Sequence, residues 1–138
     1  MRDSLRDRLL LFDLDACHYA LRASAVYGLA ECGPLREVPG TPQSILGLVE
    51  WRGHLLTVLD LPELLGHATP RGPACLIRLA PPLQGTALLL PVHVRMATAT
   101  SEPGSGETIE HEGRSARLID PPTLVRRIVK KLQEGRPA

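Results

Sequence analysis

The chain has 138 residues, a formal net charge of +1 at pH 7 and 3% aromatic residues. A chain of this length buries roughly two thirds of the surface that its unfolded form exposes, so it can fold as one compact body without a disulfide or a metal. The near-zero charge and the shortage of aromatic stacking platforms argue against nucleic-acid binding. We therefore expect a protein partner.

The cysteines and the apolar segments indicate a location in the cell. Cys17, Cys32 and Cys75 form no C-x-x-C pair and, with the five histidines, follow no metal-ligand spacing, so we expect reduced thiols and predict neither a metal nor a cofactor. The apolar run at 9–12 is too short for a signal peptide or a membrane span. We expect a cytoplasmic protein without membrane insertion.

The first quarter of the chain predicts short strands. Residues 9–14 and 18–21 form a first hairpin around a turn at 15–17, and residues 26–30 form a third strand. Residues 32–44 contain three breaker pairs, Gly-Pro, Pro-Gly and Thr-Pro, and are predicted to be a loop.

Residues 45–66 read ILGLVEWRGHLLTVLDLPELLG and predict a second hairpin followed by a short helix. Two apolar segments meet at Arg52-Gly53, which places Arg52 at an exposed tip, where binding residues are common. The segment from 45 to 49 is apolar on both faces, so we expect it to be covered on both sides, between two barrels.

The same pattern returns at 111–125, which aligns with 51–65. The alignment repeats the glycine of the turn, Asp60 as Asp120, and a proline and a leucine of the following helix. We interpret this as a weak internal duplication whose halves meet near 66–73. Asp60 and Asp120 could instead be a catalytic carboxylate pair, but capping of the two helices explains both.

The second half predicts further strands at 75–79, 86–90 and 92–98, a loop at 101–106 and a helix at 121–133. Leu124, Ile128 and Leu132 recur along one side of this helix, with basic residues on the other, either as a solvated face that matches the helix dipole or as a contact for a partner or membrane. Short strands with so few helices predict an all-β fold of closed or nearly closed barrels.

These residues resemble the CheW family of chemotaxis adaptor, or coupling, proteins. The similarity covers nearly the whole chain and is looser in the last third. It is carried by Phe12-Asp13-Leu14, Tyr19-Ala20-Leu21, Val38-Pro39-Gly40-Thr41-Pro42, Ile45-Leu46-Gly47-Leu48-Val49, Arg52-Gly53, Asp60-Leu61 and Leu64-Leu65-Gly66.

The resemblance implies two intertwined five-stranded SH3-like barrels with short helical turns and a C-terminal helix, in a single CheW-like domain over residues 1–138. It also implies an adaptor without enzymatic activity. Such adaptors bridge the cytoplasmic tip of a chemoreceptor and the regulatory domain of a sensor histidine kinase, in arrays at the membrane.

Residues matched to the family's receptor-groove and hairpin surface are the candidate partner-binding site. Val26, Gly47, Arg52 and Gly53 carry over position by position, and Trp51 joins them as an anchor if it is exposed. Gly47 could let a partner backbone or a neighbouring strand come close, or it could be a bulge glycine. The charge of Arg52 could bind a partner or simply solvate the turn.

Three departures from the family pattern bear on this site. Gly28 replaces a glutamate, so Glu50 or Glu31 would have to orient Arg52. Glu50-Trp51 replaces Asn-Leu, and Trp51, if buried, is simply a large core residue. Pro91 replaces an aspartate in the second barrel. The alternatives are a diverged double-barrel module for a nucleic acid or small ligand, and a paralogue that serves a surface-motility system.

Overall fold

The computed structural model describes residues 8–98, 108–111 and 113–134. Over these residues the chain forms ten strands, two α-helices and one 3₁₀ turn at Ala23–Ala25. The elements are β1 (Arg8–Leu14), β2 (Cys17–Arg22), β3 (Val26–Glu31), β4 (Ile45–Trp51), β5 (His54–Asp60), α1 (Leu61–Leu64), β6 (Cys75–Leu79), β7 (Thr86–Leu90), β8 (Arg95–Thr98), β9 (Thr108–His111), β10 (Arg114–Leu118) and α2 (Pro121–Glu134).

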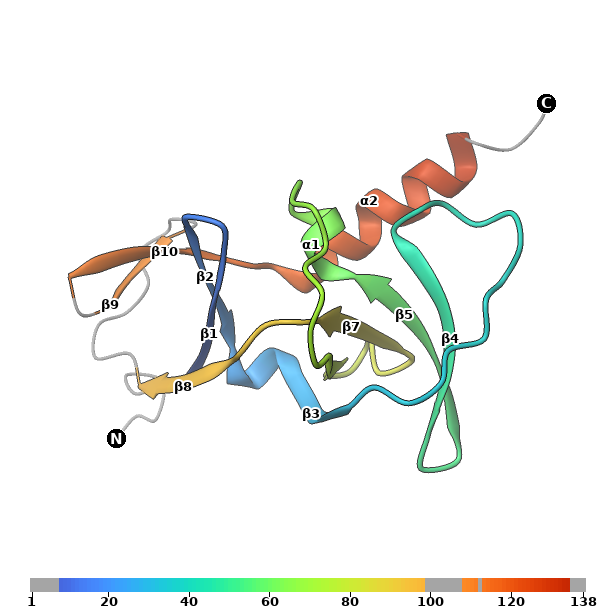
Figure 1. The fold of residues 1–138 in the computed structure, drawn as a ribbon, viewed down its shortest axis with the longest axis horizontal. Coiled ribbons are helices and arrows are strands. Elements are labelled where there is room, and N and C mark those ends of the chain that lie inside the picture. Colours follow the sequence, from blue (N-terminus) through green and yellow to red (C-terminus); the bar gives the residue numbers. More distant parts are fainter. Residues whose placement is uncertain (1–7, 99–107, 112, 135–138) are drawn as a thin grey trace.

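The strands form two five-stranded sheets that lie side by side (Figure 1). The first sheet has the order β8-β1-β2-β10-β9 and the second has the order β3-β6-β7-β5-β4. In each sheet a hairpin, β1–β2 or β6–β7, pairs in parallel through its second strand with β10 or β5. The predicted all-β fold with two five-stranded units is confirmed.

Each half of the chain contributes to both sheets. In the first half, β1 and β2 belong to the first sheet and β3, β4 and β5 to the second. In the second half, β6 and β7 belong to the second sheet and β8, β9 and β10 to the first. Both halves end with a hairpin and a helix, β4-β5-α1 and β9-β10-α2, which is the arrangement that the aligned segments predicted. The two sheets are therefore intertwined, and the prediction that the two halves of the duplication meet near residues 66–73 stays a prediction.

Alternating side chains build three separate cores. The shared core lies between the sheets, and the first-sheet and second-sheet cores lie on their other faces. The shared core includes Leu10, Phe12, Leu14, Leu21, Leu61, Ile77, Leu88, Leu90, Leu124 and Ile128. The first-sheet core consists of Leu9, Leu11, Ala20, Ile109 and Ala116, with Ala97 and Leu118 beside them. The second-sheet core includes Leu46, Val49, Trp51, Leu56, Val58, Leu76, Ala87 and Leu89.

Two predictions differ from the structure, one at strand β8 and one at helix α2. Strand β8 begins at Arg95 rather than Val92, because Val92 and Val94 pack against the shared core without pairing in the sheet. Strand β4 lies at one end of the second sheet's strand order, and its apolar residues pack on two cores, as its sequence predicted. Its Ile45 packs on the shared core, whereas Val49 packs on the second-sheet core, which explains its apolar sequence.

Helix α2 packs against the shared core over a shorter length than its apolar pattern predicted. Leu124 and Ile128 are buried in the shared core, but Leu132 is 40% exposed. The loop predicted at 101–106 lies outside the described residues.

Candidate functional site

The β4–β5 hairpin presents Arg52 at its tip. Arg52 has φ 47° and Gly53 has φ 85°, the pair of positive values that a two-residue turn of type I′ requires. Both residues are exposed. In the described part of the chain no acidic side chain pairs with Arg52, so neither Glu50 nor Glu31 orients it. The guanidinium therefore stands free on a rigid ladder.

Gly47 holds a loop of the same chain against β4. It lies at a register shift in the β4–β5 pairing and has φ 146°. A Cβ atom there would lie 2.2 Å from the Arg36 carbonyl oxygen. Arg36 and Leu48 exchange two backbone hydrogen bonds of 2.8 Å beside it. Gly47 thus combines the bulge with the close approach of a neighbouring segment, and its partner-binding role stays a prediction.

The other two candidate residues are half-buried. Trp51 packs against the second-sheet core, and Val26 packs against the shared core. The structure brings Trp51, Arg52 and Gly53 together at one end of the hairpin, and Val26 lies on β3, two residues before Gly28, whose backbone the Trp51 ring approaches. The Trp51 side chain is thus packed against the core on one part and exposed to solvent on the other.

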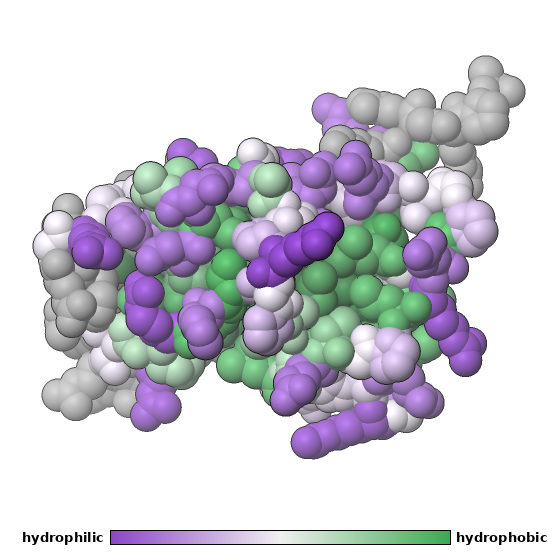
Figure 2. Space-filling model, in the orientation of Figure 1, coloured by the Kyte–Doolittle hydropathy of each residue, from purple (hydrophilic) through white to green (hydrophobic). Residues whose placement is uncertain are grey.

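An apolar groove of about 590 Å³ lies where the chain passes from the second sheet to the first. Leu29 and Glu31 of β3 form one wall, residues 71–75 form another, and residues 91–94 close the third side. Leu29 is 46% exposed, and Pro91 lines the groove in place of the expected aspartate. Figure 2 shows further hydrophobic surface over the second sheet beneath α2, bordered by hydrophilic residues.

The two aspartates begin helices. Asp60 is 7% exposed and accepts hydrogen bonds from the Glu63 backbone N–H at 3.3 Å and the Thr69 hydroxyl at 2.7 Å. Asp120 directly precedes α2 and accepts the Thr123 hydroxyl at 2.5 Å. Both carboxylates are therefore engaged in local structure.

The histidine, cysteine and acidic side chains are the remaining candidates for a metal site or a nucleophile. Across residues 8–98, 108–111 and 113–134, no three His, Cys, Asp or Glu side chains lie close enough to hold a metal ion. The three cysteines are free thiols. Burial raises the pKa of Cys32 and Cys75, which lowers their reactivity as nucleophiles.

The chain matches the family model for the CheW-like domain over residues 8–80, just over half of its length. This chain belongs to the CheW-like domain family. The matched region contains β1 to β6, the hairpin tip and Gly47. No curated protein sequence matches the chain.

The CheW-like fold extends over most of the structure. The structure resembles the crystal structure of the scaffolding protein TtCheW from Thermoanaerobacter tengcongensis with a TM-score of 0.71. The two sequences are 17% identical, and the match covers 83% of this chain and 89% of that chain. No helix among the described residues of this CheW-like domain is long and apolar enough to cross a membrane.

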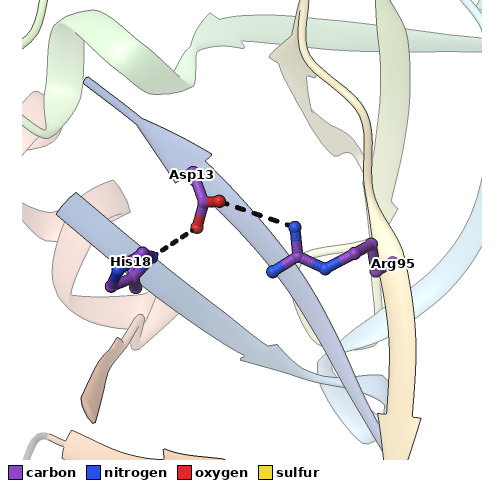
Figure 3. Close-up of polar contacts among 3 residues, drawn as sticks. All are labelled: Asp13, His18 and Arg95. Carbon is purple, nitrogen blue, oxygen red and sulfur yellow. Dashed lines mark hydrogen bonds and ion pairs between the residues drawn. The ribbon is translucent and has the colours of Figure 1, made fainter. Parts of the chain in front are cut away.

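Sequence reasoning missed two polar networks on the β1–β2 hairpin of this CheW-like domain. In the first, His18 Nδ1 donates to Asp13 at 2.7 Å, and Arg95 of β8 donates to the other oxygen of Asp13 at 3.5 Å (Figure 3). The predicted hairpin register could have placed Asp13 opposite His18, since they are direct cross-strand partners. Nothing local in the sequence indicates Arg95.

The second network joins the hairpin to the segment between the two halves of the chain. His67 Nδ1 donates to Asp15 at 2.8 Å, which leaves Nε2 to accept the Tyr19 hydroxyl at 2.7 Å. The Tyr19 ring stacks on Phe12 and meets the His67 ring edge-on. This network is therefore a structural link between β2 and the residues after α1.

Proposed function

We propose that this CheW-like domain is a non-enzymatic adaptor that couples the cytoplasmic tip of a chemoreceptor to the regulatory domain of a sensor histidine kinase. The observation that carries the proposal is the family match over residues 8–80. The likeness to a protein described as a scaffold supports it. In this proposal residues 1–138 form one domain with two barrel subdomains, located in the cytoplasm and recruited to receptor arrays at the membrane.

An adaptor needs two surfaces that can be occupied at once. The hairpin tip offers the free guanidinium of Arg52, a forked donor suited to a partner carboxylate, with Trp51 and Gly53 beside it. The groove beside Leu29 offers an apolar surface of the kind that receives one face of a helix. A receptor on one surface then controls the kinase on the other, provided that the two bindings are coupled.

The proposal is tested by capture from native cell lysate, with bound proteins identified by mass spectrometry. Wild type is expected to recover both a sensor kinase and a chemoreceptor. The Arg52→Glu variant is expected not to recover the kinase and the receptor together. Its melting temperature should stay within a few degrees of wild type, because the site is an exposed turn. Arg117→Glu, a charge reversal at an exposed position on β10, is the matched control and should retain both partners.

A second substitution separates the two surfaces. Leu29→Asp places a charge at the rim of the groove and should release only the partner that the groove binds, while the other partner is retained. Recovery of neither protein by the wild type contradicts the adaptor function. Retention of both partners by Arg52→Glu and Leu29→Asp contradicts the assignment of the surfaces.

A further inference from the structure

The face of the first sheet that carries the first-sheet core, opposite the shared core, contains a cavity. This cavity of about 450 Å³ opens between β8, β1, β2 and β10. Its apolar wall includes Leu11, Ala97 and Ala116, which belong to or pack against the first-sheet core. Its polar wall carries Asp13, His18, Arg95 and Arg114. The volume is in the range of about 300–1,000 Å³ that is usual for small-molecule sites.

The hollow follows from the side chains that line it. The two sheets have matching patterns of strand pairing, yet the second-sheet core is filled by Trp51 and several leucines, whereas small Ala97 and Ala116 line the cavity in the first sheet. Protein interiors are otherwise close-packed, so a wide space lined by alanines indicates room for a ligand.

The charges on the polar wall favour an anion. His18 and Arg95 hold Asp13 between them (Figure 3), and the hydrogen bond from His18, followed by the charge of Arg95, lowers the pKa of this carboxyl below its ordinary value. Asp13 thus stays ionised and offsets one arginine. Among the residues that the structure describes, none forms an ion pair with Arg114. One acid against two arginines leaves the wall positive even with His18 neutral.

We propose that this cavity binds a small amphipathic carboxylate, with its apolar body against Leu11, Ala97 and Ala116 and its carboxylate at Arg114 and Arg95. A guanidinium presents two parallel N–H donors to a carboxylate, which gives both affinity and orientation. The 3.5 Å contact between Arg95 and Asp13 is longer than a strong charge-assisted hydrogen bond, so Arg95 retains donors for the ligand. This inference does not depend on the adaptor function.

The test is a titration of the purified full chain, labelled with ¹⁵N, with hexanoate, hexanol and hexylamine. Hexanoate should produce saturable shifts of the backbone amides of Leu11, Ala97 and Ala116. Hexanol should bind at least about tenfold more weakly, because it lacks the charge that a guanidinium recognises. Hexylamine should not bind, because the polar wall is positive.

Three variants locate the binding in the cavity. Arg114→Gln, at an exposed position that does not contribute to the core, should weaken hexanoate binding at least about tenfold. Arg117→Gln is the matched control, since alternation along β10 places it on the opposite face, and it should bind as wild type does. Ala116→Leu fills the cavity and should abolish binding, with its melting curve recorded alongside.

Several results would overturn the proposal. They are the absence of saturable hexanoate shifts, equal binding of hexanol or hexylamine, and unchanged affinity in Arg114→Gln. Because none of these measurements involves a kinase or a receptor, a failure here leaves the adaptor function standing.

Discussion

The indole ring of Trp51 lies against the bare backbone of Gly28, where an added Cβ atom would come within 3.1 Å of the ring atom Cζ2. Gly28 is on β3 and Trp51 is on β4, the two strands at opposite ends of the second sheet's order. In a flat sheet four strand spacings of about 4.8 Å would keep these strands about 19 Å apart. The contact therefore requires the second sheet to roll up, as in a barrel. Two of the three departures from the family pattern, Gly28 and Trp51, are thus in contact with each other.

This pairing predicts a non-additive double mutant. Gly28→Val should destabilise the wild type by about 1–3 kcal/mol, because the new side chain overlaps the indole ring. In a Trp51→Leu background the same change should cost less, since the smaller side chain leaves room and valine suits a strand. Urea unfolding of the four proteins measures the difference. An equal cost of Gly28→Val in both backgrounds would show that the residues do not interact.

Local chemistry made much of the fold predictable. The turn at Arg52-Gly53 depends on two adjacent residues, and the strands β6 and β7 depend on short apolar runs between breakers, so both were predicted at their observed positions. The family resemblance supplied the intertwined arrangement that these local signals do not contain.

Non-local contacts could not be read in this way. Sequence alone gave no reason for Trp51 to meet Gly28, because the contact depends on the order of strands in a rolled sheet. The apolar run before β8 has the pattern of a strand, although Val92 and Val94 are apolar because they pack against the shared core. The cavity is not predictable for a related reason, since small alanines indicate a cavity only once their shared face is known.

Gly47 should tolerate no side chain. Gly47→Ala is expected to destabilise the protein by at least about 2 kcal/mol, because its Cβ would lie 2.2 Å from the Arg36 carbonyl oxygen and its φ of 146° disfavours other residues. Gly33→Ala is the matched control, since a Cβ there meets nothing within 4 Å, and it should change stability by less than about 0.5 kcal/mol. Thermal unfolding of both variants is the measurement. Similar melting temperatures for the two would refute the close approach of the Arg36 backbone.

The Asp13 network predicts a contribution to stability that acid removes. The pKa of Asp13 lies below its ordinary value of 3.8, chiefly because of the hydrogen bond from His18 and secondly, against an opposing effect of burial, because of the charge of Arg95. A lowered carboxyl pKa stabilises the folded state above pH 3.8, and this stabilisation is lost as the pH falls through the folded-state pKa. Asp13→Asn should therefore be less stable than wild type near neutral pH and should lose less stability on acidification.

A titration of the Asp13 carboxyl carbon by NMR checks the cause directly. The pKa of Asp13 should lie below 3.8 in the wild type. Both His18→Ala and Arg95→Gln should raise this pKa toward 3.8, and His18→Ala should raise it more, because the hydrogen bond from His18 has the larger effect. A wild-type pKa at or above 3.8 would contradict the contacts drawn in Figure 3.

The link between Tyr19 and His67 should matter more than the link between His67 and Asp15. Tyr19 is 3% exposed, so His67→Ala leaves a buried hydroxyl without its acceptor and should cost about 1–3 kcal/mol. Asp15→Asn, which keeps a residue that tolerates the φ of 55° at this turn, should cost less than about 1 kcal/mol, because the Asp15 side chain is 77% exposed. Adding Tyr19→Phe to His67→Ala should recover part of the loss, since the unpaired hydroxyl is then absent. Urea unfolding of the single and double variants measures all three effects, and a double variant no more stable than His67→Ala would show that the hydroxyl finds another partner.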